Sequence, residues 1–326
     1  MAPLRAAVIG VGYLGNFHAQ KYAQHHDAEL YAVVDTVEER ACEIAAKYGT
    51  RAVTDYRTIL SEIDVVSIVV PPANHFEIAH DCLSAGVHTL VEKPVTERVS
   101  EAETLIEIAS GDDLILQVGH LERFNPVVMA LMARIEAPRL IETQRLASYK
   151  KRGTEVDVVL DLMIHDIDIV LSIARSAIHS IHATGTAVVT QDIDIAHARI
   201  AFEDGSFAEL SASRVSKNPT RMMKVYEGQR YYELDYANHE LHIGTVEDGK
   251  ELEDASEFTF ATESVSGTDV LMEEISSFLS SVRSGAAPQV TGEDGKKALE
   301  IAIDISRRIN RYRATQPSVV DSSMDD

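Results

Sequence analysis

The first 118 or so residues alternate short apolar runs with helical stretches, and this alternation restricts the fold more than any other feature. The runs rich in Val and Ile read AAVIGVG, ELYAVVD, RAVTD, VVSIVVPP, GVHTLVEKP and DLILQVG. Between them the pattern predicts helices over residues 14–26, 37–48, 56–61, 75–85 and 98–109. Strands that alternate with helices imply parallel pairing through βαβ crossovers. The sequence therefore predicts an α/β domain that binds its ligand at the carboxyl ends of the strands.

The pattern changes in the rest of the chain. It predicts a helix near 125–136, a strand RLIETQRLAS, and then one long helix over 156–174. From about 178 to 262 strand follows strand, and EDGS at 203–206 is typical of a hairpin turn. Helices near 268–283 and 294–312 close the chain. This order favours a second, α+β domain with a mostly antiparallel sheet that carries helices on one face.

We expect three segments. Residues 1–122 form the nucleotide-binding domain and residues 123–313 form a substrate-binding and oligomerisation domain, whose last helix packs back on the first domain. Residues 314–326 read as a disordered acidic tail.

Composition excludes several classes of protein. No apolar run approaches the roughly 20 residues that span a bilayer, and the amino terminus shows no signal-peptide cleavage site, so we expect a cytoplasmic protein that does not enter membranes. The net charge of −22 argues against a nucleic-acid partner, because that affinity comes from clustered Lys and Arg. The two cysteines lack C-x-x-C spacing, which predicts neither a disulfide framework nor a structural zinc site.

The segment GVGYLG matches the G-x-G-x-x-G pattern of dinucleotide-binding loops. Gly10, Gly12 and Gly15 allow a tight turn, and the N–H groups of Tyr13 and Leu14 face an anion at a helix N-terminus. The context supports this interpretation, because the pattern follows a predicted strand and opens a predicted helix.

A second predicted strand ends in Asp35, at the spacing expected for a carboxylate that binds a ribose diol. A carboxylate there repels a 2′-phosphate, and Thr36, Val37 and Glu38 offer no cation. These residues favour NAD over NADP. The alternative role for Asp35 is a helix N-cap.

Two further loops follow predicted strands. In VVPPANHFEIA, Pro71 ends the fourth strand, and Asn74 and His75 begin a helix where a dinucleotide would pass, although a helix cap alone would explain Asn74. In LVEKPVT, the proline after Lys93 biases that lysine away from helix geometry, so Lys93 is held at a strand's carboxyl end. The alternative is that Lys93 solvates a loop and pairs with Glu92.

The predicted long helix carries a carboxylate and an imidazole one turn apart. Asp161 and His165 are four residues apart, Asp168 follows His165 by three, and Asp166 points elsewhere. A carboxylate in this position can orient an imidazole and favour its protonated form. The alternative is a core histidine on an amphipathic helix, but the number of acids in this apolar helix weakens it.

The sequence resembles the Gfo/Idh/MocA oxidoreductases, the family of glucose–fructose oxidoreductase and inositol dehydrogenase. Four features carry the resemblance in chain order: GVGYLG, EKP at 92–94, DLMIHDID, and PQVTGEDGKKALEIA at 288–302. The resemblance implies an N-terminal Rossmann domain that binds NAD, Glu92 beside the cofactor, and Lys93 as the active-site lysine at the nicotinamide. It also implies a sheet whose open face serves oligomer contacts, in a homodimer or homotetramer, and a reaction that needs no metal.

A narrower resemblance rests on VGHLERFNPVV at 118–128, read with DLMIHDIDIVL and SASRVS. These segments are similar to the UDP-N-acetylglucosamine 3-dehydrogenase branch, which oxidises the sugar's C3 hydroxyl so that a pyridoxal-phosphate aminotransferase can install nitrogen for diamino-sugar lipid A. The resemblance implies substrate contacts by several side chains, namely His120, Glu122, Arg123, Phe124 and Asn125. The alternative is a domain linker held by an Arg–Glu pair and Pro126.

The diphosphate of a UDP-sugar requires cations or backbone donors. The candidates are Arg123, Lys150, Lys151, Arg152 and Arg214, of which Lys151 lies in a basic loop that enters the long helix. A solvated run of charges is the simpler account of that loop.

The resemblance also suggests a mechanism. Hydride leaves C3 for the nicotinamide, His165 takes the hydroxyl proton, Asp161 orients His165, and Lys93 polarises the oxygen; the roles of Lys93 and His165 can be exchanged. One rival is a dehydrogenase of inositol or another free sugar. A rival of another class is a non-catalytic NAD-binding sensor, but such a protein would not need Lys93, Asp161 and His165 together.

Overall fold

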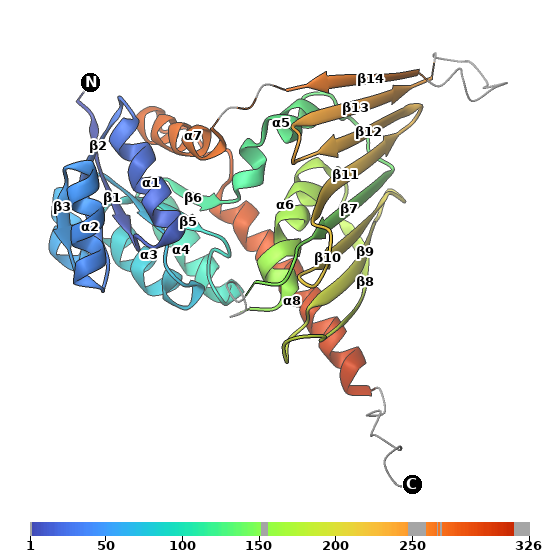
Figure 1. The fold of residues 1–326 in the computed structure, drawn as a ribbon, viewed down its shortest axis with the longest axis horizontal. Helices are drawn as coiled ribbons and strands as arrows, with labels where there is room; N and C mark the ends of the chain where they lie inside the picture. Colours follow the sequence, from blue (N-terminus) through green and yellow to red (C-terminus); the bar gives the residue numbers. More distant parts are fainter. Residues whose placement is uncertain (1, 151–155, 247–258, 266, 268, 316–326) are drawn as a thin grey trace, which may run out of the picture. The chain divides into compact units, whose positions relative to one another are not determined.

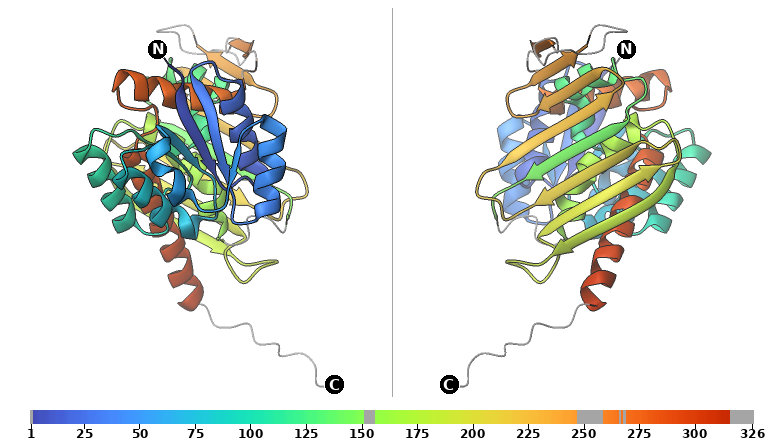
Figure 2. Two further views of the ribbon diagram at one scale, coloured as in Figure 1. Left: turned by 90° about the vertical axis from the view of Figure 1, so that its left-hand side faces the viewer. Right: turned by 90° about the vertical axis from the view of Figure 1, so that its right-hand side faces the viewer.

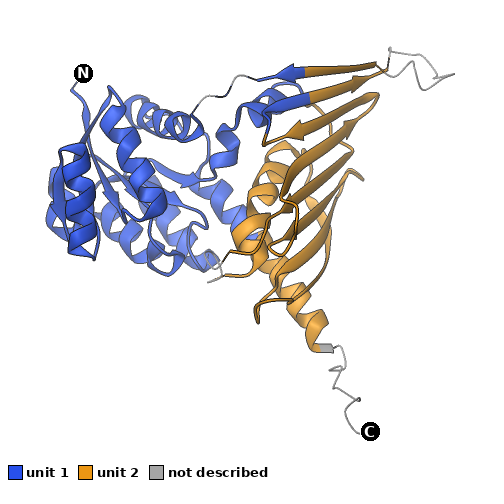
Figure 3. Cartoon of the chain, viewed as in Figure 1, with its two compact units in different colours: residues 1–134, 238–241, 263–300 blue, residues 135–237, 242–262, 301–326 orange. Residues whose placement is uncertain are grey.

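The computed structural model describes residues 2–150, 156–246, 259–265, 267 and 269–315. The chain divides into two compact units, coloured separately in Figure 3. The first unit comprises residues 1–134, 238–241 and 263–300, and the second comprises residues 135–237, 242–262 and 301–326. No helix among the described residues is both long enough and apolar enough to cross a membrane.

The first unit is built on a six-stranded parallel sheet of order β3-β2-β1-β4-β5-β6 (Figure 1). Its strands are β1 (Leu4–Ile9), β2 (Ala28–Val34), β3 (Arg51–Val53), β4 (Val65–Ile68), β5 (His88–Glu92) and β6 (Leu116–Gly119). The order reverses between β1 and β4, and in such sheets ligands bind at the carboxyl ends of the strands beside this reversal. The predicted doubly wound α/β domain is confirmed.

Helices of this unit form two groups by their contacts. Helix α1 (Tyr13–Gln24) packs against α2 (Glu38–Tyr48) and α7 (Val270–Ser284), whereas α3 (His75–Ser84) packs against α4 (Val99–Gly111). Short helices η1 (Tyr56–Glu62), η2 (Pro72–Asn74), η3 (Leu121–Phe124) and α5 (Pro126–Met132) complete the unit. Gly49 ends α2 in the left-handed conformation, as its sequence predicts.

Helix α7 joins the first unit although it lies some 150 residues after β6 in the chain. Lys21 on α1 pairs with Asp269 at 2.6 Å, and Arg283 donates to the carbonyl oxygen of Asp27 at 3.1 Å. Apolar side chains of α7, Ile275 and Phe278 among them, enter the core that contains α1 and β1. Burial of this apolar face explains why α7 belongs to the first unit, whereas the sequence analysis placed residues 123–313 together in the second domain.

The late motif PQVTGEDGKKALEIA begins α8 (Gly292–Thr315). Thr291 and Asp294 cap its first turn through reciprocal hydrogen bonds of 2.9 and 3.1 Å. A Cβ atom on Gly295 would lie 2.6 Å from the Val118 side chain of β6, so glycine lets the helix approach the sheet closely. The helix ends at Thr315, and most of the predicted tail, residues 316–326, lies outside the described residues.

The second unit is built on an eight-stranded sheet of order β14-β13-β12-β11-β7-β10-β9-β8. Its strands are β7 (Leu140–Leu146), β8 (Ile178–Thr186), β9 (Ile195–Phe202), β10 (Phe207–Ser213), β11 (Thr220–Glu227), β12 (Arg230–Asp235), β13 (Glu240–Thr245) and β14 (Thr259–Ser264). Strands β7 and β10 pair in parallel, whereas the pairs β8–β9, β9–β10, β7–β11 and β11–β12 are antiparallel. The mostly antiparallel sheet is therefore confirmed, although β13 was not predicted.

One face of this sheet packs against helix α6 (Ile164–Ile173), whereas the opposite face carries no helix among the described residues (Figure 2). Alternate residues of β9 and β10 are buried, as expected for a sheet with one covered face. The predicted hairpin joins these two strands, and Gly205 adopts a positive φ of 82° in its turn.

The predicted helix over 156–174 is not one regular helix. It begins with a π-helical turn, η4 (Val159–Met163), and continues as α6. Asp157 accepts hydrogen bonds from the N–H groups of Val159 and Leu160 at 2.9 and 3.1 Å, which caps the π turn. The i→i+5 pairing of this turn widens it, so the regular helical offset assumed between Asp161 and His165 does not apply.

A buried ion pair fastens α6 to the sheet. Arg145 on β7 donates from Nη2 to Asp166 Oδ1 at 2.7 Å and from Nε to the same carboxylate at 3.1 Å. The two side chains are only 4% and 3% exposed. Asp166 therefore points away from His165's predicted partner Asp161, as the sequence suggested, and holds the helix in register on β7.

We predict that Asp166→Asn destabilises the protein by about 3–5 kcal/mol, because it leaves the Arg145 charge buried without its partner. Chemical denaturation of the full chain measures this change. Asp304→Asn is the matched control, because Asp304 pairs with Arg308 at 2.8 Å on the surface, with side chains 38% and 46% exposed. Equal effects of the two substitutions would contradict the structural role of Asp166.

Candidate active site

The glycine loop shows why each of its glycines is present. Gly10 has a φ of +85°, and a Cβ atom there would lie 2.4 Å from the carbonyl oxygen of Val69. A Cβ on Gly15 would lie 1.8 Å from the carbonyl oxygen of Gly10. A Cβ on Gly12 would meet no described atom within 4 Å. The fold itself requires Gly10 and Gly15, whereas a side chain on Gly12 would enter open space at a pocket.

Asp35 and Arg40 hold this loop in place. Asp35 lies directly after β2 and accepts hydrogen bonds from the N–H groups of Val11 at 3.1 Å and Val37 at 3.0 Å. Arg40 donates to the carbonyl oxygens of Val11 and Gly12 at 2.7 and 3.1 Å. Val37, not Asp35, is the N-cap residue of α2. Each Asp35 oxygen retains acceptor capacity for a ribose hydroxyl.

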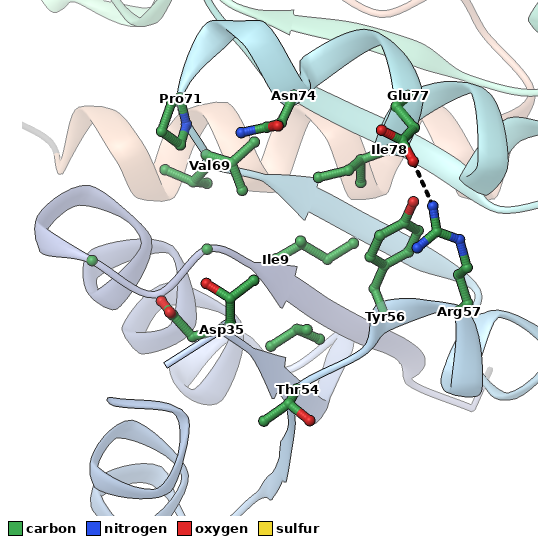
Figure 4. Close-up of a pocket in the computed structure, with 15 residues that line it drawn as sticks. Ile9, Asp35, Thr54, Tyr56, Arg57, Val69, Pro71, Asn74, Glu77 and Ile78 are labelled. Carbon is green, nitrogen blue, oxygen red and sulfur yellow. Dashed lines mark hydrogen bonds and ion pairs between the residues drawn. The ribbon is translucent and has the colours of Figure 1, made fainter. Parts of the chain in front are cut away.

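A pocket of about 420 Å³ opens at the reversal between β1 and β4. Six of the predicted cofactor residues line it, namely Gly10, Gly12, Asp35, Thr36, Pro71 and Asn74. Asp35 and Asn74 lie on opposite sides of the pocket, with the glycine loop between them (Figure 4). Tyr13 and Leu14 form the first turn of α1 just beyond this loop.

The sequence analysis did not identify Tyr56 and Arg57, which form one end of the pocket. Both residues begin η1, directly after β3, and Asp55 caps that helix by accepting from the Arg57 N–H at 3.1 Å. Arg57 is the cation among the pocket-lining residues, and it pairs with Glu77 at 2.7 Å (Figure 4) and with Asp81 at 3.1 Å. These carboxylates already neutralise it, which agrees with a cofactor lacking a 2′-phosphate. The position of Tyr56 and Arg57 after a parallel strand was the signal that could have identified them as pocket residues.

Asn74 and His75 take different roles in the loop after β4. Asn74 makes no capping hydrogen bond with its side chain, which lines the pocket. His75 is 1% exposed, and its ring nitrogens face the carbonyl oxygens of Pro94 at 2.7 Å and Val70 at 2.9 Å. Burial lowers the pKa of His75, and the two carbonyl contacts oppose this shift. His75 thus holds two loops together and is not among the pocket-lining residues.

Lys93 directly follows β5, as predicted, and lies at the carboxyl edge of the parallel sheet. Glu92 and Gly119 are paired residues of β5 and β6, so Lys93 and His120 follow two neighbouring strands at the same level. Glu92 accepts from the Lys93 N–H at 3.3 Å. Both Lys93 and His120 are therefore placed where ligands of such sheets bind.

The residues after His120 serve the packing of the first unit. Asn125 caps α5 by accepting from the Val127 N–H at 3.2 Å and donates to Glu122 at 3.1 Å. Arg123 lies 4.0 Å from Asp294, and its carbonyl oxygen accepts from Gln289 at 2.9 Å. Phe124 is 2% exposed. These contacts agree with a packing role for the segment, and the predicted substrate contacts of its side chains stay a prediction.

The π turn and α6 place the predicted catalytic residues in the second unit. Asp161 and His165 are half-buried, and Asp168 is 1% exposed. Arg214 is 4% exposed, lies 4.0 Å from both Asp161 and Asp194, and donates to the carbonyl oxygen of Val156 at 2.7 Å. Arg214 thus supports the entry to this helix. Lys151 lies outside the described residues.

We predict that Gly12→Ala leaves the thermal midpoint almost unchanged but weakens NAD binding by about tenfold or more, because the methyl group occupies ligand space. Gly15→Ala should instead destabilise the free protein by about 1–3 kcal/mol, because its Cβ meets the Gly10 carbonyl. Calorimetric NAD titration and thermal unfolding measure the two effects. A Gly12→Ala protein that binds NAD normally would show that the pocket is not the dinucleotide site.

Comparison with known proteins identifies two matched segments. Residues 4–120 match the family described as "Oxidoreductase family, NAD-binding Rossmann fold", and residues 128–231 match the "GFO/IDH/MocA C-terminal domain". The chain is 38% identical over 318 residues to UDP-N-acetylglucosamine 3-dehydrogenase of Acidithiobacillus ferrooxidans, covering 96% of this chain and 99% of that protein. It is 25% identical over 340 residues to myo-inositol 2-dehydrogenase of Thermotoga maritima, covering 96% and 98%.

A solved structure agrees with these similarities. UDP-N-acetylglucosamine 3-dehydrogenase GnnA from A. ferrooxidans matches with a TM-score of 0.89 and 36% identity, over 96% of this chain and 99% of that one. The pocket, with a free space at Gly12 and a carboxylate at the end of β2, fits the NAD that the matched family binds. The chain therefore belongs to the GFO/IDH/MocA family of NAD-binding oxidoreductases.

Proposed function

We propose that this protein oxidises the C3 hydroxyl of UDP-N-acetylglucosamine to a ketone and reduces NAD to NADH. The observation that carries the choice of substrate is the 38% identity to UDP-N-acetylglucosamine 3-dehydrogenase over 96% of this chain, against 25% to the inositol enzyme. The similarity extends over both units, so it includes the residues of the second unit as well as the nucleotide pocket.

NAD supplies the hydride acceptor. Oxidation of the alcohol then requires a base that receives the hydroxyl proton and a donor that polarises the oxygen. In our proposal His165 receives the proton, Asp161 orients the imidazole, and Lys93 donates a hydrogen bond to the oxygen. The position of Lys93 at the carboxyl edge of the NAD-binding sheet supports its part, and the reverse assignment of Lys93 and His165 uses the same groups.

The contacts of Arg214 suit a residue that holds the proposed catalytic residues in place better than one that binds the diphosphate. Asp161 and Asp194 both lie 4.0 Å from its guanidinium. A buried positive charge is therefore next to Asp161, the carboxylate that orients His165 in our proposal. Asp194 is itself fixed in the ionised form, because backbone N–H groups of the 188–190 loop bind it and lower its pKa to about 2 despite its burial.

The same proposal includes the location of the protein, its oligomeric state and the enzyme that uses its product. A cytoplasmic location suits a nucleotide-sugar substrate, and the helix-free face of the large sheet supports assembly as a homodimer or homotetramer. The 3-keto product is the substrate that a pyridoxal-phosphate aminotransferase converts to a 3-amino sugar, so we include functional coupling to such an enzyme and a place in lipid A biosynthesis.

The direct test measures NADH formation by the full chain with NAD and UDP-N-acetylglucosamine, coupled to an aminotransferase and glutamate. We expect turnover with the UDP-sugar and a 3-amino product in the mass spectrum. Free N-acetylglucosamine and myo-inositol serve as the comparison substrates. Turnover with the free polyols alone would reject the proposed substrate, and NAD binding without any turnover would favour a sensor.

We predict that Lys93→Met and His165→Asn each lower the turnover number by roughly 10²–10⁴-fold, the usual contribution of general acid–base groups. Calorimetry should show that both variants still bind NAD. Lys297→Met is the control, because Lys297 is an exposed lysine on α8. Near-normal turnover in both variants would mean that other residues carry the proton transfer.

A further inference from the structure

Three ionisable side chains meet inside the first unit, behind the turn that bears Lys93. His18 comes from α1, Glu92 ends β5, and Glu274 comes from α7. His18 and Glu274 are both 0% exposed. Candidate donor atoms of the three side chains all lie within 4.8 Å of one another, and His18 Nε2 is 3.4 Å from Glu92 Oε1.

This cluster carries two carboxyl groups in a largely buried site, in which the Glu92 side chain is 13% exposed. Tyr22, Ile275 and Phe278 of the hydrophobic core belong to the same two helices, so little solvent screens the charges. Burial and the negative charge of Glu92 raise the pKa of Glu274 well above its ordinary value. Although burial alone would raise the pKa of Glu92, the adjacent His18 and Lys93 hold it below its ordinary value. Two carboxyl groups and an imidazole thus meet where little solvent reaches them.

Hydrogen bonding within the cluster is incomplete. Neither carboxylate oxygen of Glu274 has a hydrogen-bond partner among the described residues, and neither ring nitrogen of His18 has one with hydrogen-bond geometry. The 3.4 Å between His18 and Glu92 exceeds the roughly 2.7–2.9 Å of a charge-assisted hydrogen bond. A proton on Glu274 would lessen the charge but would still leave its hydroxyl without an acceptor in this arrangement. A cation would use the free electron pairs of all three groups at once.

We propose that His18, Glu92 and Glu274 bind one divalent transition-metal ion. An imidazole with two carboxylates suits zinc or manganese. Two ligands about 2.0–2.1 Å from a tetrahedral zinc ion stand roughly 3.3–3.4 Å apart, which is the separation of His18 Nε2 and Glu92 Oε1. Small rotamer changes bring Glu274 into the same shell, and a water molecule completes it.

In this proposal the ion has a structural role, and the proposal does not depend on the proposed reaction. It would join α1, the end of β5 and α7, three elements that are far apart in the sequence. Glu92 also accepts from the Lys93 N–H at 3.3 Å, so the ion would fix the turn that presents Lys93. The backbone of α7 is tied to the sheet at the same place, because Gln117 donates to the Glu274 carbonyl oxygen at 3.3 Å.

The test uses the untagged full chain and reads metal content and stability without substrate. After dialysis against excess zinc or manganese and gel filtration, we expect about one metal ion per chain by mass spectrometry and a higher thermal midpoint than in the metal-free protein. Glu274→Gln should lower the affinity by at least about tenfold and abolish the rise in the thermal midpoint. Glu273→Gln, an exposed neighbour on α7, should behave as the wild type.

A second group of residues requires its own control. His25, His26 and Asp27 also have donor atoms within 4.8 Å of one another, and they lie nearer the surface. Loss of the ion in His26→Ala but not in Glu274→Gln would assign it to that surface group and overturn the proposal. Wild-type protein that holds no stoichiometric metal, with Glu274→Gln equally or more stable, would show that protons alone balance the cluster. Neither readout depends on the identity of the sugar.

Discussion

The first unit depends on one constraint, which is that six strands run in the same direction and end at one edge of a sheet. Each loop after a strand must therefore arrive at this edge, including the glycine loop after β1, Asp35 after β2 and Lys93 after β5. The reversal of strand order between β1 and β4 separates the two sets of loops and opens the pocket between them. The close contact between Gly10 and Gly15 allows α1 to begin at this opening.

A second feature of the molecule is the number of charges that its interior accommodates in pairs. Arg145 and Asp166 neutralise each other between β7 and α6, and Arg214 lies between Asp161 and Asp194. Such pairs contribute little net stability, because desolvation opposes their attraction, but they penalise any packing that separates them. In this protein they set the position of the π turn and α6, the segment that carries His165. The cluster around Glu274 differs, because neither carboxylate oxygen of Glu274 has a hydrogen-bond partner among the described residues.

Much of this architecture follows from local sequence patterns. Period and turn residues predicted the six parallel strands and their helices within a few residues, and EDGS predicted the hairpin between β9 and β10. Strand β13 was not predicted, although ELHIGT alternates polar and apolar residues over its first four positions. The π turn was also missed, since a wider turn leaves no period in a segment of five residues.

The candidate site divides in the same way. The sequence by itself determined Gly10, Gly12, Asp35 and Lys93, because each follows a strand whose direction the βαβ pattern fixes. Only the tertiary structure showed that His75 clasps two loops, that Asn125 caps α5, and that Tyr56 and Arg57 close the pocket. It alone brought Glu274 to His18 and Glu92 across more than 180 residues of chain. Local patterns fix backbone direction, whereas the partner of a side chain depends on how distant segments pack, and no short stretch of sequence contains that information.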